Sequence, residues 1–349
     1  MLVKDVIGEL ENFAPTVYAE DYDNVGLLTG SENWEVTGIL VTLDTLEEVV
    51  TEAISSNCNF ILSFHPIIFS GLKKITGRDY VERAVLKAIR NDIAIYAIHT
   101  ALDNSFFGVN DMICEKLGLA KRRILIPQPG SIKKLITFVP KDHASEVREA
   151  LFSVGAGSIG NYDHCSFNVP GSGSFRGNEA SNPVIGKKGE THFEEEIQIG
   201  VTFPKHFERS ILKALFDTHP YEEVAFEVTT LENHNQKIGI GMIGELEEEL
   251  PEIAFLKRVK EIFGTGCIRH SQLLEKPVKK VAVLGGSGSF AIGKAVAAGA
   301  DIFLTADLKY HDFYKAEEKL VLADIGHYES EQYTKNLLAA FLKKKFANF

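Results

Sequence analysis

Two internal duplications, one nested inside the other, constrain the fold of this chain more than any other feature. The inner duplication pairs "PKDHASEVREALF" (140–152) with "PKHFERSILKALF" (204–216) without a gap. Each copy follows an alternating apolar strand and turns its Val or Ile, Ala, Leu and Phe residues to one face of a helix. Strand and helix occurring twice in this way predict a ferredoxin-like α+β module.

The outer duplication flanks the inner one. "GILVTLD…AISSNCNFILSFH" resembles "KKVAVLG…AVAAGADIFLTAD", and each contains an apolar strand, a helix and a second apolar strand. Strands that alternate with helices predict largely parallel sheets with both faces buried. We therefore predict an α/β fold in which two pseudo-repeated α/β halves form one core domain, residues 1–125 plus 235–349. An inserted ferredoxin-like α+β domain, residues 126–234, interrupts this core.

The formal net charge of −11 and the scattered cysteines narrow the classes of partner and ligand. Phosphate contacts need clustered Lys and Arg, so a nucleic-acid partner is not expected. No apolar run approaches the ~20 residues that cross a bilayer, so we expect no membrane partner either. The four cysteines form no CxxC pair. This favours a reducing cytoplasm and leaves nitrogen and oxygen ligands for any metal.

Ionisable residues stand at or just past the ends of apolar strands in both halves. Ligands of open α/β sheets bind beyond the carboxyl ends of the strands, and the outer duplication aligns His65 with Asp307. Just past the third strand of each half stands a pair of ionisable residues with the same spacing, H-x3-D in one half and H-x3-E in the other. The residues at such ends are His65, His99, Asp103, Asp307, His327 and Glu331.

These residue types favour a metal site. A single strand-end histidine is usually hydrogen-bonded to a nearby carbonyl. Two pairs with the same spacing, H-x3-D and H-x3-E, favour metal binding over this interpretation. Imidazoles and carboxylates without thiolates suit a divalent cation such as Zn, Mn, Fe, Co or Ni. A bridging carboxylate could hold a pair of ions ~3.5–4 Å apart. The sequence therefore predicts one or two divalent metal ions per chain.

Seven motifs also occur in order along the chain: "DNVGLLTG" (23–30), "HPIIF" (65–69), "HTALDN" (99–104), "HPYEEVAFEV" (219–228), "GGSGSF" (285–290), "TADLKYHDF" (305–313) and "IGHYESE" (325–331). Over its whole length the chain resembles the Nif-three-like dinuclear metal-centre family, whose members are often labelled type-two GTP cyclohydrolase-I homologues. The resemblance implies two α/β halves around a two-metal site and an insert similar to the PII and CutA folds. It also implies a toroidal homohexamer with its metals facing an inner cavity.

The resemblance further implies the metal ligands. Carried over residue by residue, the family's ligands fall on His65, Asp103, His327 and Glu331. Phe64 stands where the family has its first histidine, so one of the two metal positions loses a ligand. Three outcomes stay open: His99 fills the gap, water fills it, or only one ion binds tightly.

Two further motifs have alternative interpretations. "GGSGSFA" (285–291) looks like a dinucleotide fingerprint, but too little chain follows it for a full double Rossmann sheet. A tight turn without cofactor is therefore favoured over NAD, while an anion nest for a substrate phosphate stays open. In "TADLKYHDF", Asp307 and His311 are either proton carriers beside the metals or ordinary capping and surface groups. "HPYEE" (219–223) predicts a hairpin or a subunit contact.

The predicted function is that of a metal-dependent hydrolase acting on a small, phosphorylated or nucleotide-like substrate. His99, Asp307 and His311 are the candidates for proton transfer in this reaction. A GTP cyclohydrolase activity is implied only by the label that members of the family carry. The alternative is a non-catalytic, metal-binding regulatory protein that senses a metabolite through the PII-like insert. A third interpretation is metal storage or delivery.

Overall fold

The structure is a computed structural model that describes residues 1–347. The chain divides into two compact units: unit 1 comprises Met1–Gln128 together with the part from Gln236 onward, and unit 2 comprises Pro129–Asn235. Within the described range the fold is mixed α/β with three sheets. Unit 1 extends to Gln128 rather than to residue 125 because β5 (Ala120–Pro127) stays paired with β10 (Gly239–Pro251) up to Pro127.

The first sheet of unit 1 is four-stranded, in the order β1-β4-β3-β2. β2, β3 and β4 run parallel, while β1 pairs antiparallel with β4. β3 and β4 are buried along their whole length, as expected for central strands covered on both faces. The strands are β1 (Gly26–Thr29), β2 (Ile39–Thr42), β3 (Phe60–Ser63) and β4 (Ala94–Ala97). The helices here are α1 (Val3–Phe13), η1 (Thr16–Tyr18), α2 (Glu47–Ser55), α3 (Tyr80–Arg90), α4 (His99–Asp103) and α5 (Val109–Leu117).

The second sheet of unit 1 has six strands, in the order β11-β14-β13-β12-β10-β5. β12, β13 and β14 are parallel, whereas β5, β10 and β11 pair antiparallel, so the expected parallel arrangement holds for three strands of each sheet. The further strands are β11 (Arg269–His270), β12 (Pro277–Ser287), β13 (Ile302–Ala306) and β14 (Val321–Asp324). The helices are α8 (Glu252–Phe263), η4 (Ser289–Ala291), α9 (Ile292–Ala297), η5 (Tyr310–Ala316), α10 (His327–Glu331) and α11 (Thr334–Lys345).

One hydrophobic cluster joins the two sheets of unit 1. It contains Phe60 and Leu62 of β3 together with Val281 of β12 and Ile302 of β13. Because protein interiors are close-packed, this shared core fixes one sheet against the other. The carboxyl end of β3 and the segment that follows β14 are thereby held at a defined separation.

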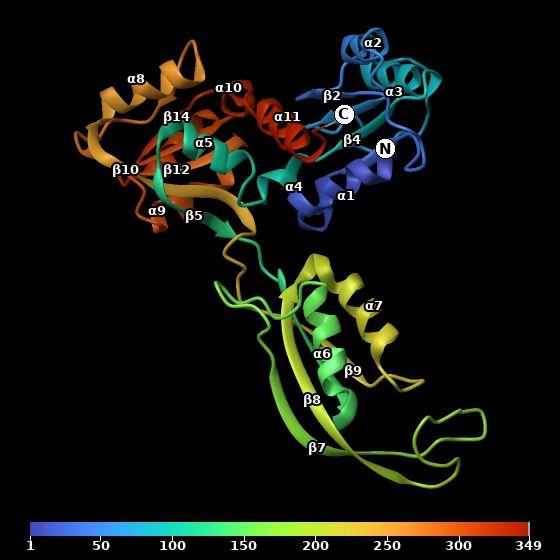
Figure 1. Cartoon of the computed structure of the whole chain (residues 1–349). Helices are drawn as coiled ribbons and strands as arrows, with labels where there is room; N and C mark the ends of the chain where they lie inside the picture. Colours follow the sequence, from blue (N-terminus) through green and yellow to red (C-terminus); the bar gives the residue numbers. More distant parts are fainter. Residues whose placement is uncertain (348–349) are drawn as a thin grey trace. The chain divides into compact units, whose positions relative to one another are not determined.

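Unit 2 is a four-stranded antiparallel sheet, in the order β7-β8-β6-β9, with α6 and α7 on one face (Figure 1). Both copies of the inner duplication follow the same course of strand, short 3-10 turn and helix. The core lies between the helices and alternate residues of the strands, among them Leu135, Val139, Ile199 and Val201. The elements are β6 (Ile132–Pro140), η2 (Lys141–His143), α6 (Ala144–Ser153), β7 (Phe167–Phe175), β8 (His192–Pro204), η3 (Lys205–Phe207), α7 (Glu208–Thr218) and β9 (Phe226–Leu231).

A membrane-spanning helix needs about 20 mainly apolar residues. Over residues 1–347, every helix is too short or too polar to cross a bilayer.

Candidate metal centre

Three metal-ligating side chains converge in unit 1, at the carboxyl ends of its parallel strands. His65 follows β3 by two residues, and His327 and Glu331 are the first and last residues of α10, just after β14. One ligand atom from each lies within 4.8 Å of the other two. The helical spacing of i to i+4 puts His327 and Glu331 on one face of α10. The topology therefore brings together residues from opposite ends of the chain.

The carboxylate of Glu331 is the centre of this cluster. Its Oε2 lies 3.2 Å from His65 Nε2 and 3.1 Å from His327 Nε2. Glu331 is buried, and Oε2 accepts no hydrogen bond from any described residue. Buried polar atoms normally make hydrogen bonds. The two histidine nitrogens lie close to Oε2, but neither is aligned to donate a hydrogen bond to it. This arrangement fits the ligand set of a divalent cation, because two imidazole nitrogens and one carboxylate oxygen lie around the same point.

Each histidine of the cluster is held from behind by an aspartate. His65 Nδ1 lies 3.0 Å from Asp44 Oδ1, and His327 Nδ1 lies 2.6 Å from Asp307 Oδ2. A carboxylate can only accept, so each Nδ1 carries a proton, and Nε2 is the nitrogen that would bind a metal once the ion displaces its own proton. The aspartates therefore select the tautomer that can bind a metal.

Asp44 was missed at the level of sequence, although it ends the first strand motif of the outer duplication, "GILVTLD". It lies two residues beyond β2, and β2 is the parallel neighbour of β3, with Thr42 opposite Ser63. That register places Asp44 beside His65. The position of Asp44 just past a strand end is visible in the sequence. Its contact with His65 could be inferred only by knowing that β2 and β3 are neighbours.

The local charges change the proton affinity of the cluster. Burial alone would lower the pKa of His65, but hydrogen bonding to Asp44 and the adjacent Glu331 raise this pKa to about 10. Proximity to Glu331, and then to Asp307, raises the pKa of His327 to about 9. Burial followed by the charge of Glu331 raises the pKa of Asp103 well above its usual range. The excess of carboxylates produces a negative potential that favours a cation.

Asp103 and His99, at the two ends of α4, lie beside this cluster. Asp103 is buried with an Oδ1 for which the described chain provides no hydrogen-bond donor. It stands outside the group of three, although its pKa responds to their charges. The His99 ring is 5.1 Å from the His65 ring, and its Nδ1 lies 2.8 Å from Asp23 Oδ1. His99 is thus held by an aspartate as the other two histidines are.

Phe64 is fully buried at the edge of the cluster. Its ring centroid lies 4.9 Å from that of His65 and 5.5 Å from that of His99. A phenyl ring offers no lone pair to a divalent ion. The space between these two histidines is therefore lined by a group that cannot bind metal.

The glycine-rich turn at the end of β12 packs directly against the cluster. Gly286 has a φ of +67°, and a Cβ on it would lie 2.4 Å from Glu331 Oε1. The amides of Gly285 and Gly286 donate to Asn110 Oδ1 and Ser330 Oγ, at 3.1 and 3.0 Å. These two amides are used within the protein, which favours the tight-turn interpretation over a phosphate nest at this point.

The remaining candidate residues are placed differently. Asp307 has a left-handed φ of 57° and accepts hydrogen bonds from Ser287 Oγ as well as from His327. His311 is exposed in η5, where its ring contacts those of Tyr310 and Tyr314. His311 is absent from the group of described residues that converges on Glu331. Asp307 therefore positions a candidate ligand, while His311 belongs to an aromatic surface cluster.

The fold and this cluster define a mixed α/β protein with a candidate metal site assembled from both of its unit 1 sheets. The chain belongs to the Duf34/NIF3 (NGG1p interacting factor 3) family, whose model matches residues 1–349. The family resemblance found in the sequence is thus confirmed.

Relatives and solved structures match over nearly the full length. A "GTP cyclohydrolase 1 type 2 homolog" of Bacillus subtilis is 38% identical, covering 98% of this chain and 94% of the relative. One from Halalkalibacterium halodurans is 40% identical, with 92% and 87% covered. The crystal structure of a Bacillus cereus protein related to NIF3 superposes with a TM-score of 0.84 at 38% identity, covering 99% of this chain and 94% of that one. A Staphylococcus aureus protein gives a TM-score of 0.77 at 30% identity, with 100% and 95% covered.

Proposed function

We propose that the protein is a metal-dependent hydrolase with a small, phosphorylated or nucleotide-like substrate. The observation that carries this proposal is the convergence of His65, His327 and Glu331 within 4.8 Å, with a buried carboxylate oxygen that accepts no hydrogen bond from the described residues. The label of the relatives, GTP cyclohydrolase 1 type 2 homolog, supports a nucleotide-like substrate class. A divalent ion bound here would supply Lewis acidity and a water of lowered pKa.

The chain's own residues have distinct roles in this proposal. His65, His327 and Glu331 hold the ion, and Asp103 completes the ligand set from the end of α4. Because N and O donors without thiolate suit Zn, Mn, Fe, Co and Ni alike, the donor set admits all five ions. His99 is the proton carrier, because its Nδ1 is engaged by Asp23 while its ring adjoins that of His65.

We further propose that one ion per chain binds tightly. Phe64 fills the side of the cluster between His65 and His99 without offering a ligand atom. His99 is absent from the group of described residues whose ligand atoms lie within 4.8 Å of one another, which disfavours its use as a replacement ligand. A second ion would therefore lack one donor and be held weakly.

Elemental analysis combined with an activity screen tests the proposal. Protein loaded with each of the five ions is assayed against nucleotides and phosphoesters, and metal content is measured in parallel. Glu331→Ala is expected to lose both the ion and turnover. Glu329→Ala, on the same helix α10 but turned away from the cluster, should keep both. Turnover that persists undiminished in Glu331→Ala would contradict the assignment.

At the level of the whole chain, we propose that unit 1 is the metal-binding α/β core, built from two pseudo-repeated halves. Unit 2 is then the inserted PII/CutA-like α+β domain, an assignment supported by its separate core and antiparallel sheet. The resemblance described above supports a homohexamer, and the cysteine pattern supports a cytoplasmic location. Light scattering coupled to size-exclusion chromatography tests the assembly, because a monomeric mass would contradict it.

A second candidate function is regulation by a metabolite bound to unit 2, with the metal in a structural role. The observation that favours it is a cavity of about 600 Å³ within unit 2. This volume lies in the range of small-molecule sites.

A further inference from the structure

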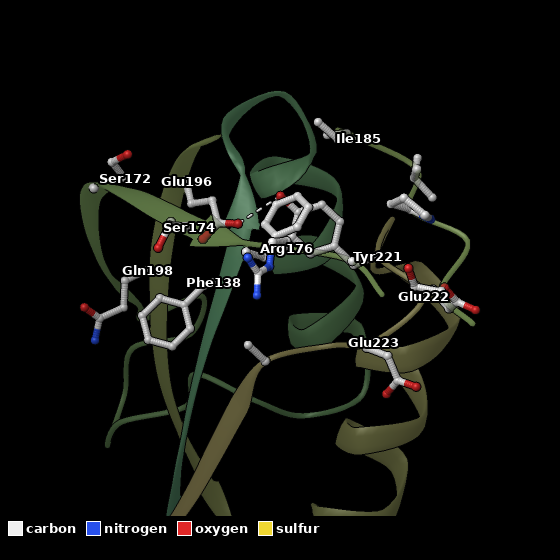
Figure 2. Close-up of a pocket in the computed structure, with 18 of the residues that line it drawn as sticks. Phe138, Ser172, Ser174, Arg176, Ile185, Glu196, Gln198, Tyr221, Glu222 and Glu223 are labelled. Atoms are coloured by element: carbon white, nitrogen blue, oxygen red, sulfur yellow. Dashed lines mark hydrogen bonds between the residues drawn. The ribbon is translucent and has the colours of Figure 1, made fainter. Parts of the chain in front are cut away.

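The cavity of unit 2 lies on the face of the sheet that α6 and α7 leave open (Figure 2). Phe138 of β6 and Glu196 and Gln198 of β8 line it, and they alternate along their strands with Val139 and Ile199, which pack against the helices. β7, the loop after it and the segment before β9 complete the walls. The cavity is therefore built on the sheet and lies entirely within unit 2.

Most of the wall is apolar or aromatic. Such a lining suits the uncharged part of a small organic molecule, because burying apolar surface drives its binding. Figure 2 shows Phe138, Ile185 and Tyr221 around the cavity. The larger apolar and aromatic side chains of the wall include Phe138, Val169, Phe175, Val184, Ile185 and Tyr221.

A buried carboxylate faces this wall. Glu196 is 9% exposed, and its Oε1 accepts a hydrogen bond of 2.9 Å from the Tyr221 hydroxyl. Burial, and then this hydrogen bond, raise the pKa of Tyr221, so the hydroxyl remains a donor. A Cβ on Gly173 would lie 2.2 Å from Glu196 Oε2, so the carboxylate can occupy this place only because the neighbouring strand carries glycine there.

An unpaired guanidinium lines the same cavity. Arg176, the first residue after β7, has no ion-pair or hydrogen-bond partner among residues 1–347. A guanidinium binds carboxylates in a bidentate, planar geometry. Arg176 and Glu196 therefore present opposite charges to one cavity without neutralising each other.

We propose that this cavity binds a small zwitterion of the α-amino acid type with an apolar side chain. The ligand carboxylate would pair with Arg176 and its ammonium group with Glu196, while its side chain packs against Phe138 and the aromatic wall. This inference deepens the second candidate function by naming its site and ligand class. The site uses no residue of the metal centre.

The charge balance discriminates against other ligand classes. Glu222 and Glu223 also line the cavity, so three carboxylates stand against one guanidinium. A nucleotide or other polyanion would be repelled by this excess. An anion without an ammonium group would donate no hydrogen bond to the buried Glu196. An uncharged molecule would leave the guanidinium of Arg176 without an anionic partner.

Isothermal titration calorimetry of the full-length protein tests the inference. The probes are L-phenylalanine, L-leucine and L-methionine, with N-acetyl-L-phenylalanine, 2-phenylethylamine and GMP as comparators. At least one amino acid is expected to bind at least tenfold more tightly than every comparator. Each tenfold step corresponds to about 1.4 kcal/mol. Failure of all three amino acids at millimolar concentration, or equal binding of the acetylated form or of GMP, overturns the proposal.

Matched variants assign the charges. Arg176→Gln and Glu196→Gln should each weaken amino-acid binding at least tenfold. Glu195→Gln, the exposed neighbour on β8, and Arg209→Gln, on the exposed side of α7, should bind as the wild type does. Arg176 is exposed, so its variant is expected to fold even if Glu196→Gln does not. Wild-type affinity in Arg176→Gln overturns the assignment.

The metal-site variant separates this inference from the proposed hydrolase function. Glu331→Ala should retain amino-acid binding in full, because the cavity lies wholly in unit 2. Loss of amino-acid binding in Arg176→Gln with unchanged metal content would locate the ligand site in unit 2.

Discussion

Glu331 Oε2 lies 3.2 Å from His65 Nε2, although the two residues come from opposite ends of the chain. His65 follows the central strand β3 of one sheet, and Glu331 ends the short helix α10 that follows β14 of the other. A single hydrophobic cluster holds the two sheets together. The contact therefore depends on packing between the two α/β parts of unit 1, and a metal ion bound there would link them.

The substitution Phe64→His should add a metal position. The Phe64 ring adjoins the rings of both His65 and His99, so an imidazole at this place adds a nitrogen donor next to the existing cluster. We expect the metal content to rise from one ion per chain to two, measured by elemental analysis after dialysis. Phe64→Leu is the control and should stay at one. Two tightly held ions in the wild type would show that Phe64 does not limit the stoichiometry.

The convergence of the cluster could be anticipated from sequence because it follows from simple positional rules. His65 and His327 stand just past apolar strands, and the spacing of His327 and Glu331 places both on one helix face. Asp44 could not be identified in this way, because its contact with His65 depends on β2 being the parallel neighbour of β3. Strand order is a long-range property that local patterns do not contain.

His311 is a candidate that the fold places away from the group around Glu331. It lies four residues after Asp307 in the sequence, which made it a candidate proton carrier. The chain turns into η5 after β13, and this turn places the ring against Tyr310 and Tyr314 at the surface. Nearness along the chain did not predict nearness in space. The sequence predicted a metabolite-sensing insert as one alternative, but it could not locate the cavity of unit 2, whose lining combines the loop after β7 with residues distant in sequence such as Phe138 and Tyr221.

Removing the aspartates behind the histidines should weaken metal binding without abolishing it. In Asp307→Asn and Asp44→Asn, the amide no longer enforces the tautomer with a proton on Nδ1, so Nε2 is a poorer ligand. We expect the affinity for metal to fall about 10- to 100-fold in each variant. Competition against a chromogenic chelator measures this change.

The control for these two variants is Asp21→Asn, at an exposed aspartate of the N-terminal loop. It should leave the affinity for metal unchanged. If Asp44→Asn and Asp307→Asn bind metal as tightly as this control, the aspartates have no positioning role. The far-ultraviolet circular dichroism of all three variants should match that of the wild type.

The substitution Gly286→Ala should destabilise unit 1 and release metal. Its left-handed φ of +67° disfavours any side chain, and the new Cβ would meet Glu331 Oε1 at 2.4 Å. We expect the free energy of unfolding to fall by about 2 kcal/mol or more, with a Tm lower by about 4–8 °C. Differential scanning calorimetry and elemental analysis provide the two readouts.

A second glycine supplies a control of opposite sign. Gly293 lies in α9, is exposed, and a Cβ there would meet nothing within 4 Å in the described part of the chain. Gly293→Ala should therefore raise the free energy of unfolding by up to about 1 kcal/mol, because alanine favours the helix and restricts the unfolded chain. A fall in Tm for both variants would mean that the effect at Gly286 is not specific to its contact with Glu331.

The stability of unit 2 should decrease as the pH falls below about 6.5. Burial lowers the pKa of His206 to about 4, and burial also lowers the pKa of His219, whose Nδ1 accepts from the Tyr221 amide. In the unfolded chain both imidazoles would bind a proton at about pH 6.5. Between this value and the folded pKa, the unfolded state binds more protons, so acidification favours unfolding.

His206→Gln isolates one of these two contributions. The variant should lose fewer degrees of Tm than the wild type between pH 7 and pH 5, a window that lies above the ordinary carboxylate range. Ser210→Ala, in the following helix α7, changes no titratable group and should keep the wild-type slope. Calorimetry of the full chain across this window measures the slope. Because a neutral glutamine cannot gain a proton, an unchanged slope in His206→Gln would mean that His206 is not kept neutral by the fold.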